Sequence, residues 1–163
     1  ESLEVVKPKL KDGAHIYIFA TCKTFSHFES IIQQYFDIRN VLIWVKEKHS
    51  TGDVFGNYGE QYEMIIFASK GKTTWVSEKR PINVFHVNKV ASRLHPTEKP
   101  VELLKQLITI ATVEGETVLD SFAGVASTLI AAKETGREYI GVELNEEYYI
   151  KGQRRLEEHG ETE

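Results

Sequence analysis

Cysteine is almost absent from this 163-residue chain, which contains Cys22 and no other. A single cysteine excludes an internal disulfide framework and fits a reducing cell interior. No signal peptide is visible, and no apolar run approaches the roughly 20 residues that cross a bilayer. We therefore expect a cytoplasmic protein with no membrane partner. Cys22 could act as a nucleophile, but a buried or half-buried position without chemistry is the simpler expectation.

A strong net charge is also lacking. The formal charge of −4 argues against a general coat for nucleic acid, while 41% apolar and 27% charged residues are ordinary for a globular protein. Residues 70–93 nevertheless hold six basic side chains against one acid, Glu78, with Trp75 and Phe85 between them. This segment suits phosphate contacts with apolar wedges into DNA, but a solvated charged loop fits the same pattern.

The chain does not begin with methionine. Its first residues read as the end of a helix that stops near Asp12-Gly13, so we expect a fragment of a longer protein. Periodicity predicts alternating strands and helices, and therefore an α/β sandwich with a mainly parallel sheet. The expected strands are 15–21, 41–46, 62–71, 82–87, 117–120 and 139–144, and the expected helices are 25–36, 101–112, 126–135 and 145–159.

Two strand ends carry carboxylates. Asp120 ends a buried-type strand and begins Asp-Ser-Phe-Ala-Gly, in which Gly124 allows a backbone to approach a ligand at the start of the next helix. Glu143 ends another strand 23 positions later, where a carboxylate can accept hydrogen bonds from ribose hydroxyls. The array suits an adenosine-containing cofactor. The alternatives are an ordinary strand-to-helix turn and a solvated loop acid.

The segment His-Pro-Thr-Glu-Lys-Pro at 95–100 is the third motif. Its two prolines stiffen the entry to a helix, while Thr97 and Lys99 offer polar contacts. His95 could take an acid–base role, although a positioning or structural role is simpler. The six histidines are scattered without partner cysteines, so no metal site is expected.

Taken in order, these motifs resemble the β-type N4-cytosine/N6-adenine DNA methyltransferases, whose motifs occur in permuted order. Residues 95–108 resemble that family's motif ten, 118–128 its motif one, and 137–156 its motif two with the following helix. Residues 6–20 and 40–71 resemble the later part of the catalytic half. The resemblance covers essentially the whole chain and implies a Rossmann-like, S-adenosylmethionine-dependent methyltransferase sandwich.

The resemblance also implies roles for individual residues. Asp120, Phe122 and Gly124 would hold the methionine end and backbone face of S-adenosylmethionine, and Glu143 would take its ribose. The same pocket would be bordered by His95, Thr97, Lys99 and Pro100. Two departures stand out, because Ser121 replaces the family's usual proline and Val125-Ala126 replaces Ser-Gly. The Ala126 methyl would lie where family backbones come closest to the ligand.

The family's catalytic tetrapeptide, Asp/Asn/Ser-Pro-Pro-Tyr/Phe, is missing, and the chain has no Pro-Pro dipeptide at all. We therefore name no catalytic residue. In the family sheet, the strand before that tetrapeptide lies between the strand at 15–20 and the motif-one strand. Its loss would leave buried backbone groups unpaired. We expect that segment to belong to the parent protein; otherwise the two halves pair directly or another chain fills the gap.

The resulting expectation is one methyltransferase domain over 1–163: the rest of the catalytic half at 1–71, a basic loop at 72–94 that could contact DNA, and a cofactor half at 95–163. The parent protein would methylate adenine N6 or cytosine N4 in double-stranded DNA, in a restriction–modification or phage context, while this chain alone would be inactive. A homodimer is left open. The alternatives are a non-catalytic DNA- or partner-binding module and a methyltransferase for RNA or small molecules.

Overall fold

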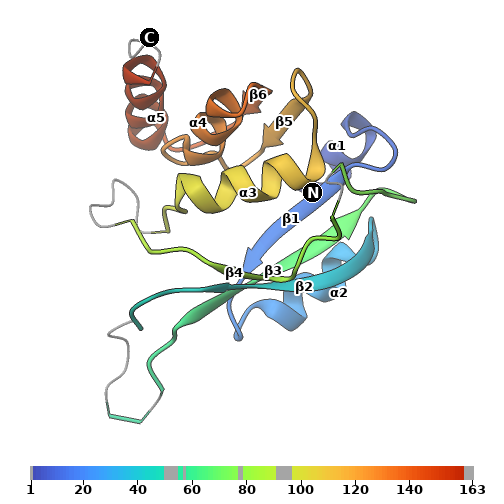
Figure 1. Cartoon of the computed structure of the whole chain (residues 1–163), viewed down its shortest axis with the longest axis vertical. Helices are drawn as coiled ribbons and strands as arrows, with labels where there is room; N and C mark the ends of the chain where they lie inside the picture. Colours follow the sequence, from blue (N-terminus) through green and yellow to red (C-terminus); the bar gives the residue numbers. More distant parts are fainter. Residues whose placement is uncertain (1, 50–54, 57, 77–78, 91–96, 160–163) are drawn as a thin grey trace. The chain divides into compact units, whose positions relative to one another are not determined.

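A computed structural model describes residues 2–49, 55–56, 58–76, 79–90 and 97–159 of the chain (Figure 1). The polypeptide divides into two compact units, Glu1–Asn88 and Lys89–Glu163, and each is described by itself. The boundary between the two units falls inside the segment 72–94, which the sequence analysis places between the catalytic and cofactor halves. The expectation that both halves form one methyltransferase domain stays a prediction.

A four-stranded sheet forms the centre of the first unit, with the order β1-β3-β2-β4. Its strands are β1 (His15–Ala20), β2 (Asp37–Val45), β3 (Tyr62–Ser69) and β4 (Val84–His86). β3 is antiparallel to both of its neighbours, and β4 is parallel to β2. Three of the four strands therefore run in one direction and β3 alone is reversed.

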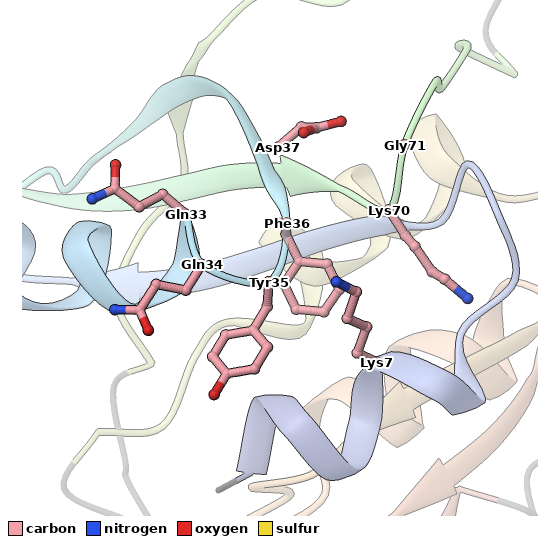
Figure 2. A pocket seen from close by; sticks show the side chains of 8 residues that line it. All are labelled: Lys7, Gln33, Gln34, Tyr35, Phe36, Asp37, Lys70 and Gly71. Atoms are coloured by element: carbon pink, nitrogen blue, oxygen red, sulfur yellow. The ribbon is translucent and has the colours of Figure 1, made fainter.

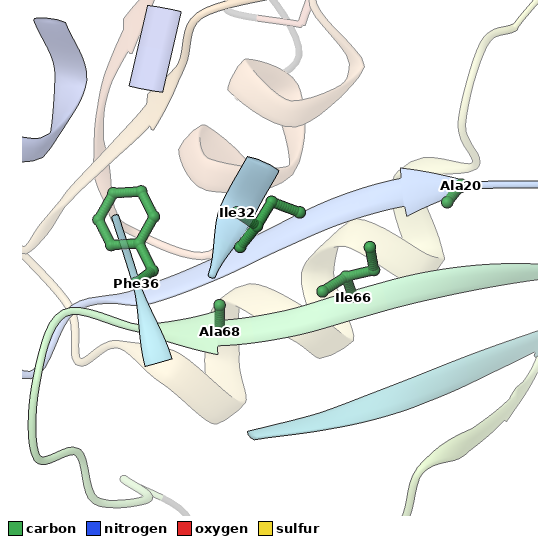
Figure 3. Packing of buried hydrophobic residues seen from close by; sticks show 5 residues of the cluster. All are labelled: Ala20, Ile32, Phe36, Ile66 and Ala68. Carbon is green, nitrogen blue, oxygen red and sulfur yellow. The ribbon is translucent and has the colours of Figure 1, made fainter. Parts of the chain in front are cut away.

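Helix α2 (Phe25–Ile32) covers one face of this sheet, because its apolar side chains recur at helical spacing. Ile32 and Phe36 form one buried cluster with Ile66 and Ala68 of β3 and with Ala20 at the end of β1 (Figure 3). The helix ends four residues earlier than the sequence predicts. Phe36 still reaches the same core from the turn that follows the helix.

The start of the chain is helical, as expected, with α1 (Ser2–Val6) and the short 3-10 helix η1 (Lys7–Lys9). Two sequence expectations in this unit are wrong. Cys22 is exposed, because it lies in the turn between β1 and α2. Phe85, which the sequence offered as an apolar wedge for DNA, is only 6% exposed and belongs to the core.

The second unit alternates helices with two parallel strands: α3 (Val101–Ala111), β5 (Thr117–Asp120), α4 (Ser127–Glu134), β6 (Glu138–Gly141) and α5 (Glu146–Glu158). Asn145 caps α5, as the sequence predicts, since its Oδ1 accepts a hydrogen bond from Tyr148 N at 3.1 Å. Gly136 ends α4 with a φ of 71°, a left-handed conformation that favours glycine.

The mixed α/β architecture and the mainly parallel strand direction agree with the sequence. In the described residues, β1 lies at one end of its strand order and β5 pairs with β6 alone. None of the described helices is long and apolar enough to cross a membrane.

Candidate functional site

The candidate site lies in the second unit, at the carboxyl ends of β5 and β6. Asp120 is the last residue of β5, its register partner on β6 is Gly141, and Glu143 follows two residues later. Ligands of open α/β sheets bind at this edge of parallel strands. The register therefore brings together the two carboxylates that the sequence placed at strand ends.

Asp120 stabilises the turn that follows it. Its Oδ1 accepts a hydrogen bond from Phe122 N at 2.9 Å, and its carbonyl accepts one from Val142 N at 2.9 Å. Ala123 N donates in turn to the Val142 carbonyl, also at 2.9 Å. The loop after β5 is thus hydrogen-bonded to the segment that follows β6.

Glu143 binds the same loop from the other strand. Its Oε2 accepts a hydrogen bond from Gly124 N at 2.7 Å, and its Oε1 accepts one from Asn145 N at 2.8 Å. Both distances are short, as expected for a charged acceptor. An ionised carboxylate has about four acceptor positions, so each oxygen keeps capacity for a further donor. The carboxylates of Asp120 and Glu143 therefore converge on one loop, 120–124.

This loop has a restricted backbone. Gly124 has a φ of 54° and Ala126 a φ of 66°, and Ala126 is the only residue other than glycine with positive φ in the described part of the chain. The left-handed conformation costs an L-residue roughly 1–2 kcal/mol. Ala126 is buried, and an ideal Cβ built on Gly152 would lie 3.2 Å from its methyl group. The methyl that the sequence flagged as an obstacle to a ligand thus lies against α5.

Phe122 is the apolar member of the site. It is 74% exposed, although large apolar side chains usually lie in the core. Its backbone N–H donates to the Asp120 carboxylate, so the hydrogen bond places the backbone of Phe122 beside that group. The loop therefore offers an apolar surface next to two acceptor groups.

The 95–100 segment enters α3. His95 lies outside the described residues. Thr97 is exposed, Lys99 is half-buried, and Pro100 is buried at the N-cap of α3 in an extended conformation. Of the four residues that the sequence assigned here, the structure describes these three.

Sequence reasoning missed two residues of this site, Glu98 and Arg155. The Glu98 side chain is 3% exposed, and its Oε1 lies 3.1 Å from an Arg155 guanidinium nitrogen. Arg155 also donates to the Val125 carbonyl at 2.6 Å. Glu98 stands inside a motif that the sequence did single out. No local sequence pattern pairs Glu98 with a residue 57 positions away, so this ion pair could be identified only from the three-dimensional structure.

A separate cleft of about 330 Å³ lies in the first unit (Figure 2). Its walls come from η1, the turn that follows α2, the start of β2 and the turn after β3, and none of the motif residues lines it. Lys70 of that cleft is engaged, because its Nζ donates to the Leu10 carbonyl at 2.7 Å and lies 3.4 Å from Asp12. The chemistry-bearing residues therefore point to the loop in the second unit rather than to this cleft.

The start of the basic segment is fixed to β1. Trp75 packs edge-on against His15 with ring centroids 5.7 Å apart, and a ring nitrogen of His15 lies 3.0 Å from the Thr74 carbonyl. Burial lowers the pKa of His15, the bond to Thr74 opposes that effect, and the charge of Lys11 adds to it. His15 Nδ1 also lies 3.1 Å from the Tyr17 hydroxyl, whose own pKa is raised by burial.

Comparison with known proteins decides the family. Residues 1–153 match the family described as DNA methylase. The chain belongs to this DNA methylase family. The type II methyltransferase M.HindIII of Haemophilus influenzae is 32% identical over 113 residues, which are 66% of this chain and 37% of that protein. The DNA adenine methyltransferase YhdJ of Escherichia coli is 36% identical over 104 residues, which are 61% of this chain and 35% of that protein.

Solved structures agree with this assignment. The crystal structure of an M1.HpyAVI–SAM complex superposes with a TM-score of 0.81 at 27% identity, covering 94% of this chain and 81% of that one. The resemblance to DNA amino-methyltransferases and the methyltransferase fold are therefore confirmed. The chain spans little more than a third of the length of the two curated relatives.

Proposed function

We propose that this chain forms the cofactor-binding part of an S-adenosylmethionine-dependent DNA methyltransferase that acts on adenine N6 or cytosine N4. One observation carries the proposal: the carboxylates of Asp120 and Glu143 converge on the loop 120–124 at the ends of two parallel strands. The membership in a DNA methylase family and the similarity to an M1.HpyAVI–SAM complex support it.

The residues fit the chemistry of this cofactor. Each Glu143 oxygen already binds one backbone N–H and has room for a ribose hydroxyl as a second donor. A positively charged sulfonium is favoured near the Asp120 carboxylate, and the exposed Phe122 ring offers an apolar face to the ligand. Gly124 adds no side chain between the loop and the ligand. The pocket would be completed by His95, Thr97, Lys99 and Pro100.

When bound, S-adenosylmethionine supplies an electrophilic methyl group on its sulfonium. The role of this chain is to hold the ribose, orient the cofactor and keep its loop in place. The chain has no Pro-Pro dipeptide, so the groups that position the target base in this family are not among its residues. We therefore assign it no catalytic residue.

Double-stranded DNA is the proposed substrate, and the segment 72–94 its proposed contact. Lys72, Lys79 and Arg80 are exposed in this segment. Cations that neutralise phosphates release counterions and so bind DNA without reading its sequence. Burial of Phe85 removes that ring as an apolar wedge, so we assign this segment electrostatic binding through its exposed cations.

Calorimetric titration of the full-length protein that carries this chain with S-adenosylmethionine tests the proposal. Glu143→Ala is expected to weaken binding by at least about tenfold, since hydrogen bonds to a charged group contribute roughly 1.5–3 kcal/mol each. Glu146→Ala is the matched control, because Glu146 is an exposed acid in the first turn of α5. No binding by the unchanged protein, or equal affinities of the protein and its Glu143→Ala variant, would contradict the proposal.

A further inference from the structure

Arg155 of α5 joins the two segments that the proposed cofactor site uses. One guanidinium nitrogen donates to the Val125 carbonyl at 2.6 Å and lies 3.3 Å from Ser127 Oγ, while another lies 3.1 Å from Glu98 Oε1. The first two contacts hold the loop after β5, and the third holds the 97–100 segment. A planar guanidinium can make these contacts together, whereas a lysine ammonium cannot reproduce the same fork.

The two loop contacts of Arg155 flank a strained residue. Val125 and Ser127 are the neighbours of Ala126, which has the left-handed φ of 66°. A residue in this region relaxes to a commoner conformation unless its surroundings hold it. Relaxation at Ala126 would move Gly124, whose N–H is bound by Glu143. The conformation of the candidate site thus depends on what holds Ala126.

Gly152 completes the support from α5. It lies three residues before Arg155, on the same side of the helix, and is buried. A Cβ built there would lie 3.2 Å from the Ala126 methyl, 3.4 Å from Ala126 N and 3.4 Å from the Gly124 carbonyl. The bare glycine backbone therefore lets the helix approach the loop closely enough for Arg155 to reach it.

Stability alone does not explain this arrangement. The side chains of Glu98 and Arg155 are 3% and 16% exposed, so both charges lose most of their hydration. A buried ion pair often stabilises a fold no more than apolar residues of the same size would. Its geometric effect is distinct, because it fixes the loop and the 97–100 segment relative to each other.

We infer that Arg155 and Gly152 are positioning residues that hold the cofactor loop in its binding conformation, with Glu98 orienting the Arg155 guanidinium. The inference rests on the proposed function of the loop. It assigns α5 a role in cofactor affinity, although its residues 152 and 155 act through the loop rather than on the ligand.

Affinity for S-adenosylmethionine in a double-mutant cycle tests the inference on the full-length protein. Arg155→Lys is expected to raise the Kd about tenfold, because it weakens charge-assisted bonds to the loop. In the Ala126→Gly background the same substitution is expected to raise the Kd less than about threefold, since glycine adopts the left-handed conformation readily. A residue that only stabilised the fold would have the same effect in both backgrounds.

Two further variants keep the test decisive. Lys151→Gln is the matched control on α5, because Lys151 pairs with Glu147 rather than with the loop, and its Kd should stay within twofold. Glu98→Gln keeps the shape and one acceptor but removes the charge, and should raise the Kd about threefold without unfolding the protein. It takes the place of Arg155→Lys if that variant fails to fold.

The outcomes separate the two claims. The inference alone would be overturned if the unchanged protein binds the cofactor and the Kd of Arg155→Lys or of Glu98→Gln lies within twofold of its Kd. Equal losses in both Ala126 backgrounds would also overturn it. Unchanged protein without measurable affinity would instead overturn the proposed function.

Discussion

His15 shows how a single residue of the first unit connects packing with pH. Its ring contacts the rings of Tyr17, Phe67 and Trp75, and one of its nitrogens lies 3.0 Å from the Thr74 carbonyl. Burial among these groups disfavours the charged imidazolium and lowers the pKa of His15, so the neutral ring is favoured more in the folded protein than in the unfolded chain. His15 therefore links the stability of the folded chain to protonation.

We predict that the free energy of unfolding falls as the pH drops below about 6.5, the ordinary pKa of histidine. The folded pKa lies below the unfolded one, so the unfolded chain binds more protons in that interval. The contribution of His15 is complete above the unfolded pKa and is lost as pH falls through the folded pKa. Urea unfolding at pH 7.5 and 5.5 measures this change in the free energy of unfolding.

In His15→Gln the difference in the free energy of unfolding between pH 7.5 and pH 5.5 should shrink, because the substituted side chain does not titrate. His27→Gln is the control, since His27 is exposed on α2. Equal pH dependence in all three proteins would show that His15 is not the linked group.

Burial of individual residues was the part that the sequence predicted least well. Cys22 was expected to be at least half-buried and is exposed, while Phe85 was offered as a DNA contact and is in the core. Both depend on neighbours far away in the sequence. The convergence of Asp120 and Glu143 could be predicted, because Asp120 ends one strand and Glu143 follows another that pairs with it in parallel.

At the scale of elements, helix propensity and packing have opposite effects at Gly152, where α5 contacts the loop at Ala126. Gly152 in a helix interior costs about 1 kcal/mol relative to alanine. An added methyl there would be within 3.2 Å of the Ala126 methyl, and overpacking of this kind costs about 1–3 kcal/mol. Overpacking therefore outweighs the gain in helix propensity.

Gly152→Ala is accordingly predicted to destabilise the protein by about 1 kcal/mol in the native background. In the Ala126→Gly background the closest contact disappears, leaving 3.4 Å contacts to backbone atoms, and the cost should fall by about 1 kcal/mol. Urea unfolding of the four proteins gives the coupling energy. Costs that add to within about 0.3 kcal/mol would show that the two residues do not pack against each other.

Most elements could be predicted from local patterns. Helical spacing in 101–112 and the Asn145 cap predicted α3 and α5 closely. The reversed direction of β3 in the sheet, and its place between β1 and β2, could not be predicted in this way. Local periodicity identifies a strand, but the choice of neighbour depends on side chains distributed over the whole unit.

At the scale of the molecule, the chain is matched as part of longer proteins, and it spans 37% of M.HindIII and 35% of YhdJ. Its charge is unevenly distributed: the total is −4, yet the segment 70–93 is basic. Under the proposed function, a basic segment on a chain of net negative charge would confine phosphate contacts to one region.

Neutralising Lys72, Lys79 and Arg80 together with glutamine is predicted to weaken binding of the full-length protein to duplex DNA to a similar extent for all sequences. The slope of log K against log salt concentration should fall by about 2–3, since each phosphate contact contributes about 0.9. Fluorescence anisotropy over a salt series measures both quantities. An unchanged slope, or a loss confined to one DNA sequence, would rule out the proposed electrostatic contact.

The central claim is that Glu143 recognises a ribose. The most direct test compares binding of S-adenosylmethionine with binding of its analogue lacking both ribose hydroxyls, in the full-length protein and its Glu143→Gln variant. We predict that the unchanged protein prefers the natural cofactor by at least about tenfold and that the variant prefers it by less than about threefold. Equal affinities of the unchanged protein for the two ligands would contradict it.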